Sequence, residues 1–357
     1  MLVRVLHRSA WGGGLFPSGG RNISDRAGTD YTAAMNLLAA MRYLVALDKH
    51  RHFGRAAQAC HITQPALSNA LRALEDEFGV AIIKRSRIYG GLTHEGEVVL
   101  DTARRMLREL EVLTQELEST AESPRGALRM GAVPTAMPLL TAFAAMLRRS
   151  YPGLVPTMLA LSSPDIEAQL EDLSLDLALG YTERLSGEGG RFRSWPQAQE
   201  RYYFLRRQSG KGGMNLQYGA PMTWAEAAAF PLCQLTPDMH NRAIIDGVFA
   251  SIGMSSPPAI ETNSLLAVTL AVSVGDVCAI LPGAMVAAVR GQADLEALPL
   301  VEPDIRTPLG FIAVVNERPS RAVQAALRLM AAPEWGALLE RHASGVHSFL
   351  ESTHPSV

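Results

Sequence analysis

The sequence predicts an α/β protein with an all-α module near its N-terminus, and three patterns support this fold class. Small and apolar residues between Ala56 and Leu71 follow the spacing of a helix-turn-helix motif. Apolar residues then alternate four and three positions apart between Val99 and Leu117, as in a helix that packs along its length. Beyond Gly126, short apolar strands alternate with amphipathic helices. We therefore expect a small helical module, a long helix and a larger α/β module.

The composition limits the class of protein. The chain has 357 residues, 48% of them hydrophobic, which is enough to form more than one core. Its 33 Lys and Arg stand against 35 Asp and Glu, so any affinity for nucleic acid must come from a local patch. Three widely spaced cysteines form no disulfide framework, which favours a reducing cytoplasm. The longest apolar run, Leu265 to Val274, is too short to cross a bilayer and predicts a buried helix.

The N-terminal third is predicted to be helical after an irregular start. Residues 1–34 are rich in glycine and arginine without periodicity, so we expect a disordered leader or a start codon assigned too early. Helices are then predicted at 36–49 and 54–60. Thr63 has the character of an N-cap and Pro65 that of a first-turn residue, so the next helix begins there.

A wing and a long helix follow. After Gly79, an apolar pair, a basic cluster and a Gly-Gly turn predict a two-stranded wing. A long helix is predicted from about Thr93 to Ala121, and residues 122–126 predict a hinge. The apolar seam of this helix consists of Val99, Ala103, Met106, Leu110, Leu113 and Leu117. A lone helix would leave that seam in water, so we expect it to dimerise.

The remaining chain predicts two α/β series. The first has strands at 128–133, 154–161 and 175–180, with helices at 138–149 and 165–173. The second has strands at 202–205, 231–235, 259–261 and 277–281, with helices at 242–252 and 264–274. A strand at 309–315 returns, and a helix at 321–330 closes the chain. Because strands alternate with helices, we expect a largely parallel sheet.

A family resemblance extends these predictions. The segment from Met35 to Gly96, which contains "CHITQPALSNALRALE", resembles the winged helix-turn-helix of LysR-type transcriptional regulators over its whole length. From Arg129 onward the chain resembles the family's effector-binding module, which has the fold of two-lobed periplasmic binding proteins. The resemblance implies a DNA-binding domain at 35–93, a linker and dimerisation helix at 94–121, and an effector-binding domain at 127–357. Its lobes would comprise 127–196 with 306–357, and 197–304.

The resemblance also implies a function. We expect a cytoplasmic regulator that binds double-stranded operator DNA as a homodimer or homotetramer and acts with RNA polymerase, without a cofactor, a metal or a membrane. Amides and hydroxyls at the start of a recognition helix can hydrogen-bond to base edges in the major groove. The expected DNA contacts are Thr63, Gln64, Pro65, Ser68, Asn69, Arg72, Arg85 and Arg87. Residues 35–93 carry eight Lys and Arg against four Asp and Glu, a net charge of +4 that favours phosphate binding.

The effector is expected where strands end and helices begin, because free N–H groups there attract anions. The candidate residues at such junctions are Thr135, Ser162, Ser163, Thr236 and Asn263. For each one, plain helix capping is an alternative to ligand contact. Together they predict a small anion, such as a carboxylate, as the effector.

Three alternative functions remain. An enzyme or small-molecule-binding protein on an α/β scaffold is one, although the sequence contains no G-x-S-x-G, Walker loop or H-E-x-x-H motif. A ligand-independent architectural DNA binder would not need the large α/β module. A redox-responsive regulator is suggested because the helix-turn-helix resembles the family's peroxide-sensing branch. That branch's reactive cysteine falls on His240 and its resolving partner near Phe249, and Cys233 lies upstream in a predicted strand, so we do not expect a peroxide-switch disulfide.

Overall fold

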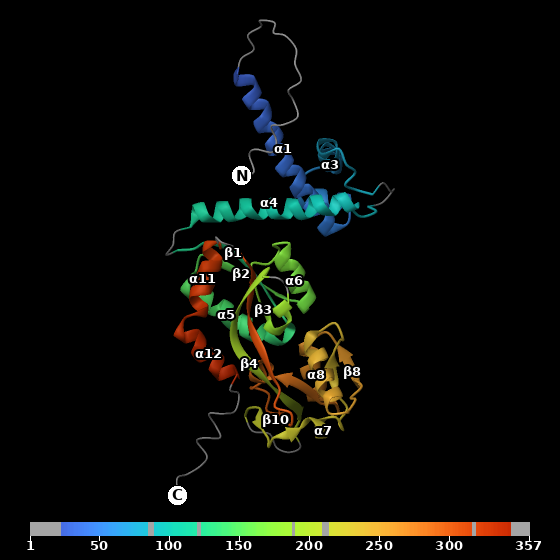
Figure 1. The fold of residues 1–357 in the computed structure, drawn as a ribbon, viewed down its shortest axis with the longest axis vertical. Helices are drawn as coiled ribbons and strands as arrows, with labels where there is room; N and C mark the ends of the chain where they lie inside the picture. The colour runs from blue at the N-terminus through green and yellow to red at the C-terminus, as the bar shows by residue number, and fades with distance from the viewer. Residues whose placement is uncertain are drawn as a thin grey trace. The chain divides into compact units, whose positions relative to one another are not determined.

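The computed structural model describes residues 23–84, 89–119, 123–187, 190–208, 214–315 and 319–343. The chain divides into two compact units, Met1–Ala103 and Arg104–Val357, and each is described separately. Figure 1 shows the helical elements of the first unit and the α/β elements of the second. No helix among the described residues is long and apolar enough to cross a membrane.

The first unit is built on three helices, α1 (Ile23–His50), α2 (Phe53–Ala59) and α3 (Gln64–Phe78). Leu44, Ala57 and Leu71, one from each helix, are buried together in its core. The predicted helix-turn-helix is therefore confirmed. The expectation of irregular structure up to residue 34 is wrong for the part that can be described, because α1 begins at Ile23. Extending an existing helix costs far less than nucleating one, so the packed end of α1 can support this extension.

Helix α3 begins and ends as its sequence predicts. The Thr63 hydroxyl accepts a hydrogen bond from the Ala66 N–H at 3.4 Å, and Pro65 lies in the first turn. Gly79 ends the helix with a φ of 67°, a left-handed conformation that favours glycine. The helix is thus fixed at both ends by local signals.

The described part of the wing is a single antiparallel bridge between Ile83 and Leu92. The Glu75 carboxylate ties it to α3 by accepting the N–H groups of Ile82 and Ile83 at 2.7 and 3.0 Å. A Cβ on Gly96 would lie 2.1 Å from the Ile82 carbonyl oxygen, so this close approach requires glycine. The predicted contacts Arg85 and Arg87 lie outside the described residues.

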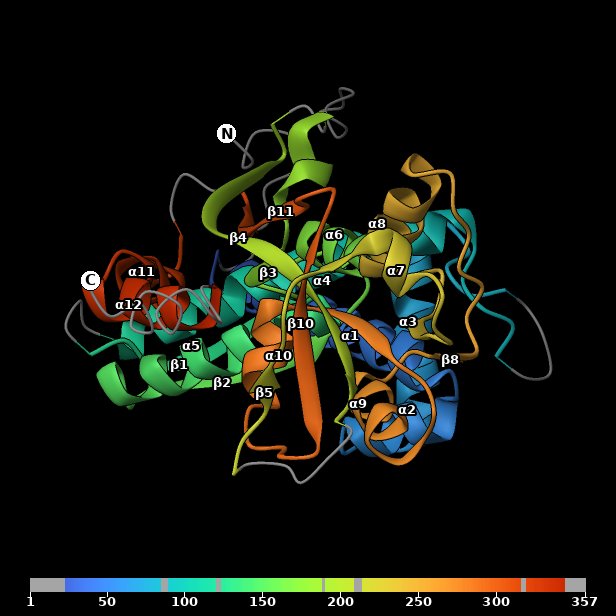
Figure 2. The same ribbon diagram turned by 90° about the horizontal axis from the view of Figure 1, so that it is seen from below.

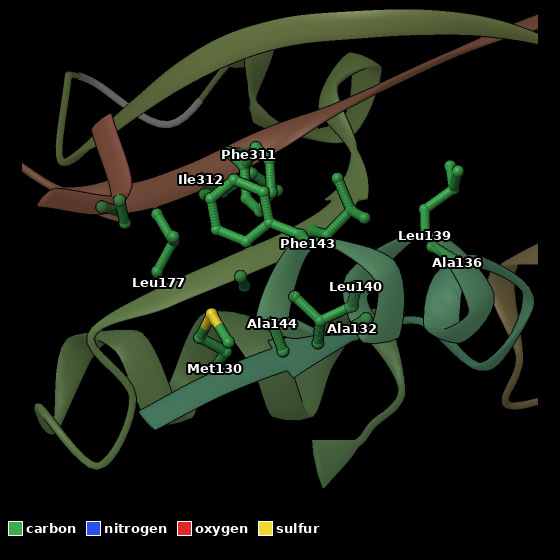
Figure 3. Close-up of a cluster of buried hydrophobic side chains, with 14 of the residues drawn as sticks. Met130, Ala132, Ala136, Leu139, Leu140, Phe143, Ala144, Leu177, Phe311 and Ile312 are labelled. Carbon is green, nitrogen blue, oxygen red and sulfur yellow. The ribbon is translucent and has the colours of Figure 1, made fainter. Parts of the chain in front are cut away.

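The second unit contains the C-terminal part of α4 (His94–Glu118) and a first lobe. In that lobe, β1 (Gly126–Ala132) pairs in parallel with β2 (Leu154–Ala160) and β3 (Leu177–Tyr181). Helices α5 (Met137–Ser150) and α6 (Ser163–Glu171) connect these strands. Figure 3 shows Phe143 of α5 among the buried side chains of the sheet, including Leu177 and Phe311. The predicted first series is confirmed.

Two long strands join the lobes, β4 (Phe192–Arg207) and β11 (Arg306–Val314). They pair antiparallel with each other, and β11 is also antiparallel to β3. The main sheet has the order β2-β1-β3-β11-β4-β10-β5, and Figure 1 shows β4 running from the first lobe into the second. The sheet is therefore mixed, and the prediction of a largely parallel sheet is wrong. The chain crosses between the lobes in opposite directions, which makes these two strands antiparallel.

The second lobe packs on both faces of β4. Tyr203 and Leu205 belong to one core and Tyr202 and Phe204 to another, because successive side chains of a strand alternate between its faces. Figure 2 shows β10 (Leu295–Val301) alongside β4. Five other elements of this lobe match the predicted second series: β7 (Cys233–Leu235), α8 (His240–Ser251), β8 (Ile260–Thr262), α9 (Leu265–Val274) and β9 (Ala279–Pro282).

Some elements were not predicted. These are β5 (Gln217–Tyr218), β6 (Met222–Thr223), α7 (Trp224–Ala227), α10 (Gly283–Ala288), β10 and α12 (Pro333–Ala343). The expectation that α9 is buried is only partly right. Leu266, Leu270 and Val274 are 68%, 48% and 78% exposed, on one face of the helix. The predicted helix at 321–330 and the returning strand are confirmed as α11 (Arg321–Met330) and β11.

Candidate functional site

Helix α3 presents a polar face at its N-terminal end. Its apolar side chains Leu67, Leu71 and Leu74 are buried against the other helices. The predicted contacts on the opposite side, Thr63, Gln64, Pro65, Asn69 and Arg72, are exposed, and Ser68 is half-buried. The face contributes nothing to the core, so its hydroxyls, amides and guanidinium are available to a partner.

The start of α2 lies next to the start of α3, which the sequence did not reveal. The His52 Nδ1 atom caps α2 by accepting the N–H groups of Gly54 and Arg55 at 3.1 and 3.3 Å. The position of a Cβ on Gly54 lies 3.6 Å from Gln64 Oε1. Two helix N-termini, with the exposed Arg55, therefore adjoin one end of the polar face. Histidine is not a common N-cap, so a search for Ser, Thr, Asp and Asn misses it.

One face of α4 carries exposed apolar side chains. Met106, Leu113 and Leu117 are 40%, 55% and 79% exposed, and Leu110 is half-buried. The other predicted seam residues differ, since Ala103 is fully buried and Val99 is half-buried. Apolar surface in this regular spacing is typical of a helix that pairs with another copy.

The opposite face of α4 is held by ion pairs within the second unit. Arg104 pairs with Asp172 at 3.4 Å, and Glu111 pairs with Arg129 at 2.9 Å. Arg108 pairs with Asp176, and both side chains are buried. Glu116 accepts the backbone N–H of Arg321 at 2.9 Å. Arg104, Arg108 and Glu111 are four and three positions apart and so share a helix face, which packs on the first lobe while the apolar side remains exposed.

A small cavity lies between the lobes, and we call it the inner cavity. Its lining includes Thr135, Ser162, Ser163 and Tyr181 from the first lobe and Leu235, Met239, His240 and Asn241 from the second. It admits the centre of a water molecule over only about 10 Å³. Three of the predicted effector contacts therefore meet there, together with polar side chains from the opposite lobe.

A hydrogen-bond network crosses the inner cavity. The Tyr181 hydroxyl lies 2.9 Å from the Thr135 hydroxyl and accepts an N–H from the Asn241 amide at 3.5 Å. Burial raises the pKa of Tyr181 well above its usual value, so its hydroxyl keeps its proton at neutral pH. Tyr181 and Asn241 were missed by the sequence analysis. Tyr181 is the last residue of the buried strand β3. A hydroxyl group at the end of a buried strand is the sequence feature that could have identified this residue as a candidate ligand contact.

The two serines at the start of α6 differ. Ser162 is the N-cap: its hydroxyl accepts the Asp165 N–H at 3.3 Å and donates to the Asp165 carboxylate at 2.6 Å. Ser163 is 6% exposed, and its hydroxyl oxygen is buried without a hydrogen-bond partner among the described residues. A buried polar group without a partner is costly. Ser163 is therefore available to a ligand, whereas Ser162 is explained by capping.

A wider groove, which we call the outer groove, adjoins the inner cavity. It has a volume of about 790 Å³ and shares Pro134 and Met239 with the inner cavity. Asn263 lines the outer groove, and Thr236 is not among the residues that line either space. The five predicted effector contacts are thus distributed over more than one environment.

His240 is the first residue of α8 and reaches across to the first lobe. Its Nε2 atom lies 3.3 Å from a carboxylate oxygen of Glu183. The three cysteines are free, and Cys233 and Cys278 are buried. Burial raises the thiol pKa of both, which lowers the thiolate fraction and hence the reactivity toward oxidants.

Comparison with known proteins identifies both parts of the chain. Residues 38–97 match the family model described as the bacterial regulatory helix-turn-helix protein, lysR family. Residues 121–332 match the LysR substrate binding domain. The two matches together cover most of the chain.

Several curated relatives are regulators. The chain is 29% identical to the DNA-binding transcriptional dual regulator OxyR of Escherichia coli, over 76% of this chain and 87% of that protein. It is 31% identical to the SDS degradation transcriptional activation protein of a Pseudomonas species, over 70% of this chain and 79% of that one. It is 39% identical to a hydrogen peroxide-inducible genes activator of Pectobacterium carotovorum, but only over 39% of this chain and 46% of that relative.

Solved structures agree on the fold. The structure of full-length CbnR in complex with its target DNA aligns with 82% of this chain and with 99% of the CbnR chain. The sequence identity is 22% and the TM-score is 0.60. A full-length variant of OxyR from Pseudomonas aeruginosa gives the same identity and TM-score, over 82% of this chain and 94% of its own. From both family matches and these relatives, the chain belongs to the LysR family of DNA-binding transcriptional regulators.

Proposed function

We propose that a small anion, bound in the inner cavity between the lobes, controls the transcriptional output of this LysR-type regulator. The observation that carries the proposal is the Ser163 hydroxyl, which is buried, has no hydrogen-bond partner in the part of the chain that the structure describes, and lies in the first turn of α6. Free N–H groups at a helix N-terminus favour an anion there. The Thr135, Tyr181 and Asn241 side chains add neutral hydrogen-bonding groups. No Asp or Glu is among the described residues that line this cavity.

The DNA-binding part of the proposal rests on the polar face of α3. Its exposed amides, hydroxyls and guanidinium suit base edges and phosphates. We assign base contacts to Gln64, Ser68 and Asn69, with Thr63 and Pro65 beside them, and phosphate contacts to Arg72, Arg85 and Arg87. The domains are proposed to be those expected from the sequence, with DNA binding at 35–93, the linker helix at 94–121 and effector binding at 127–357.

The oligomer is proposed to form through the apolar face of α4, with further contacts between effector-binding domains giving a tetramer. The exposure of Met106, Leu113 and Leu117 supports the first contact. RNA polymerase is the proposed partner in transcription, the cytoplasm the proposed location, and we assign no enzymatic activity.

A redox switch is the competing function, because several relatives are named as activators of hydrogen peroxide-inducible genes. The buried thiols of Cys233 and Cys278 and the histidine at position 240 argue against it.

The test compares Ser163→Ala with Ser162→Ala in the full-length protein. A panel of small organic and inorganic anions is screened by thermal unfolding, and the best binder is then measured by calorimetry. We expect Ser163→Ala to weaken binding by about ten- to a hundredfold, since a hydrogen bond to a charged group contributes about 1.5–3 kcal/mol. Operator affinity without the anion should not change. If no anion raises the unfolding temperature, or if Ser163→Ala binds as tightly as wild type, the proposal is wrong.

A further inference from the structure

A groove of about 820 Å³ lies within the first unit, between α3 and the segment 79–84 that leads into the wing, and we call it the wing groove. Ser68, Arg72 and Asp76 line it from α3, and Lys84 lines it from the wing. Side chains four positions apart follow one another along a helix face. The α3 side therefore presents a hydroxyl, a guanidinium and a carboxylate in that order, and it continues the polar face of α3 toward the wing.

The charges that line the wing groove suit the phosphate backbone of a DNA strand. Arg72 and Lys84 are both exposed and come from its two sides. Of the two carboxylates in the lining, Glu75 already accepts two backbone N–H groups of the wing. Asp76 lies one turn beyond Arg72 and would repel a phosphate there. A strand whose bases contact α3 would thus have phosphates beside Arg72 and Lys84, and Asp76 would mark the end of this contact.

The wing is fastened to the helix-turn-helix by the ring of Tyr89. This ring packs edge-on against Phe53, with the ring centroids 6.1 Å apart and the planes at 79°. Phe53 is the first residue of α2 and also lines the wing groove. The Arg51 guanidinium lies over the Tyr89 ring, 5.8 Å from its centroid. Tyr89 is therefore clamped between the start of α2 and the turn that precedes it.

Both ends of this clamp are tied to other parts of the first unit. The Arg51 guanidinium pairs with Asp48 of α1 at 2.9 Å, and Asp48 is buried. On the wing, the Lys84 N–H donates to the carbonyl of Gly91, two positions after Tyr89, at 3.0 Å. A displacement of Tyr89 would therefore displace Lys84 on the neighbouring segment.

We propose that Tyr89 is a positioning residue for DNA binding, because its clamped ring sets the spacing of Lys84 and Arg72 across the wing groove. The proposal rests on the proposed DNA contacts of α3 and assigns to Tyr89 an effect exerted through Lys84. A wing that is ordered before binding gains affinity, since its conformational freedom is not lost in the complex. Without the clamp, the wing would have to become ordered when DNA binds.

Double-mutant cycles in the full-length protein test this proposal. Dissociation constants are measured for operator and random DNA at several salt concentrations. Tyr89→Leu should weaken binding to both DNAs about tenfold, because it removes an aromatic pair and a cation–π contact. Lys84→Gln should also weaken both and lower the slope of log K against log salt by about one.

The coupling between the two positions is the readout that a purely structural role of Tyr89 would not change. In the Tyr89→Leu background, Lys84→Gln should weaken binding by no more than about twofold, because Lys84 is no longer held at the groove. Arg72→Ala lies on the helix itself, so it should weaken binding by the same factor in both backgrounds.

Two further variants serve as controls. Tyr89→Phe keeps the ring that makes both contacts and should bind like wild type. Tyr43→Leu makes the same change as Tyr89→Leu at a half-buried position of α1, and it should leave DNA affinity unchanged. Urea unfolding shows whether each variant is folded. If Tyr89→Leu is not, Phe53→Leu removes the same aromatic pair from the α2 side and takes its place in the cycle.

Wild-type affinity in Tyr89→Leu would overturn the proposal, and so would a Tyr89→Phe that binds as weakly as Tyr89→Leu. A Lys84→Gln effect that is absent, or equally large in both backgrounds, would overturn it as well. If Arg72→Ala leaves affinity and salt dependence unchanged, the phosphate contact assigned to α3 is wrong, and with it the spacing that Tyr89 is proposed to set.

Discussion

At the scale of single residues, Glu200 is a carboxyl group that is almost fully buried in the second unit. Its side chain lies on β4 and is 3% exposed, and neither carboxylate oxygen has a hydrogen-bond partner among the residues that the structure describes. It lines a small cavity with Leu139, Ala284 and Leu339. Burial raises the pKa of Glu200 from its ordinary value of 4.5 to about 8. The folded protein therefore holds this carboxyl protonated at neutral pH.

Stability should consequently fall as the pH rises through this range. Between pH 4.5 and about 8 the unfolded chain loses a proton that the folded chain keeps, so the free energy of unfolding decreases with pH. Glu200→Gln should remove this slope and be more stable than wild type at pH 8 by a few kcal/mol, since one pKa unit corresponds to about 1.4 kcal/mol. Urea unfolding of wild type and Glu200→Gln at several pH values measures how the free energy of unfolding depends on pH. Glu334→Gln, at the exposed start of α12, is the control. An unchanged slope in Glu200→Gln would assign the pH dependence to other groups.

Substitutions of the proposed base-contacting and phosphate-contacting residues should have different effects on DNA binding. Gln64→Ala should reduce the preference for operator over random DNA by about 1–3 kcal/mol, because an amide can make two hydrogen bonds to an adenine. Arg72→Ala should weaken binding to both DNAs and lower the slope of log K against log salt by about one. Titrations of both DNAs at several salt concentrations measure these effects, and Gln58→Ala on the exposed side of α2 is the control. Identical changes in specificity for the two variants would contradict the assignment.

At the scale of elements, the two faces of α4 have different roles. If the proposed dimer forms through α4, Leu113→Asp should convert it to a monomer, because a charge in an apolar seam must be desolvated when two helices pair. The isolated chain should stay folded, since Leu113 is already 55% exposed. Light scattering after size-exclusion chromatography measures the mass, and Thr114→Asp one position away is the control. A dimeric Leu113→Asp would place the interface on another surface.

The polar face of α4 contains a buried ion pair whose loss should be costly. Burial raises the pKa of Asp176, although Arg108 beside it acts in the opposite direction. Asp176→Ala leaves the buried Arg108 paired with the half-buried Glu111 at 3.0 Å and removes the carboxylate that accepts the Arg129 N–H at 2.7 Å, which should cost about 3 kcal/mol of unfolding free energy. Glu171→Ala breaks the exposed pair with Arg191 and should cost at most about 1 kcal/mol. Similar losses for both variants in urea unfolding would show that the Arg108 pair is screened by water.

At the scale of the whole molecule, the chain is similar to activators of hydrogen peroxide-inducible genes, and we expect it to work without a thiol switch. Cys233 and Cys278 lie on neighbouring segments, where the Cys233 N–H donates to the Cys278 carbonyl at 2.8 Å, yet both are buried and free. Replacing Cys60, Cys233 and Cys278 by Ser or Ala should therefore leave operator binding and its response to the effector unchanged. Micromolar peroxide should not alter transcription in either form. A peroxide response that the replacement abolishes would restore the redox function.

The sequence alone determined the features that depend on neighbouring residues. The cap at Thr63, the left-handed Gly79 and the buried stripe of α3 all follow from contacts within one helix or turn, so the helix-turn-helix and its exposed polar face could be predicted. The strands and helices of the first lobe were predictable for the same reason, because their apolar periodicity is local. The candidate serines at the start of α6 came from the same kind of signal.

Only the tertiary structure decided which of these residues meet. Thr135, Ser163, Tyr181 and Asn241 are far apart along the chain and line one cavity because β1, β3, α6 and α8 converge between the lobes. Thr236 lies outside this lining, and the packing of α5, α10 and α12 against β4 buries Glu200 in a separate small cavity. The direction of β4 and β11 likewise depends on where the chain crosses between the lobes, which makes the sheet mixed. Local sequence patterns do not specify which distant segments pack against one another. That packing brings the side chains of the cavity together and excludes water from around them.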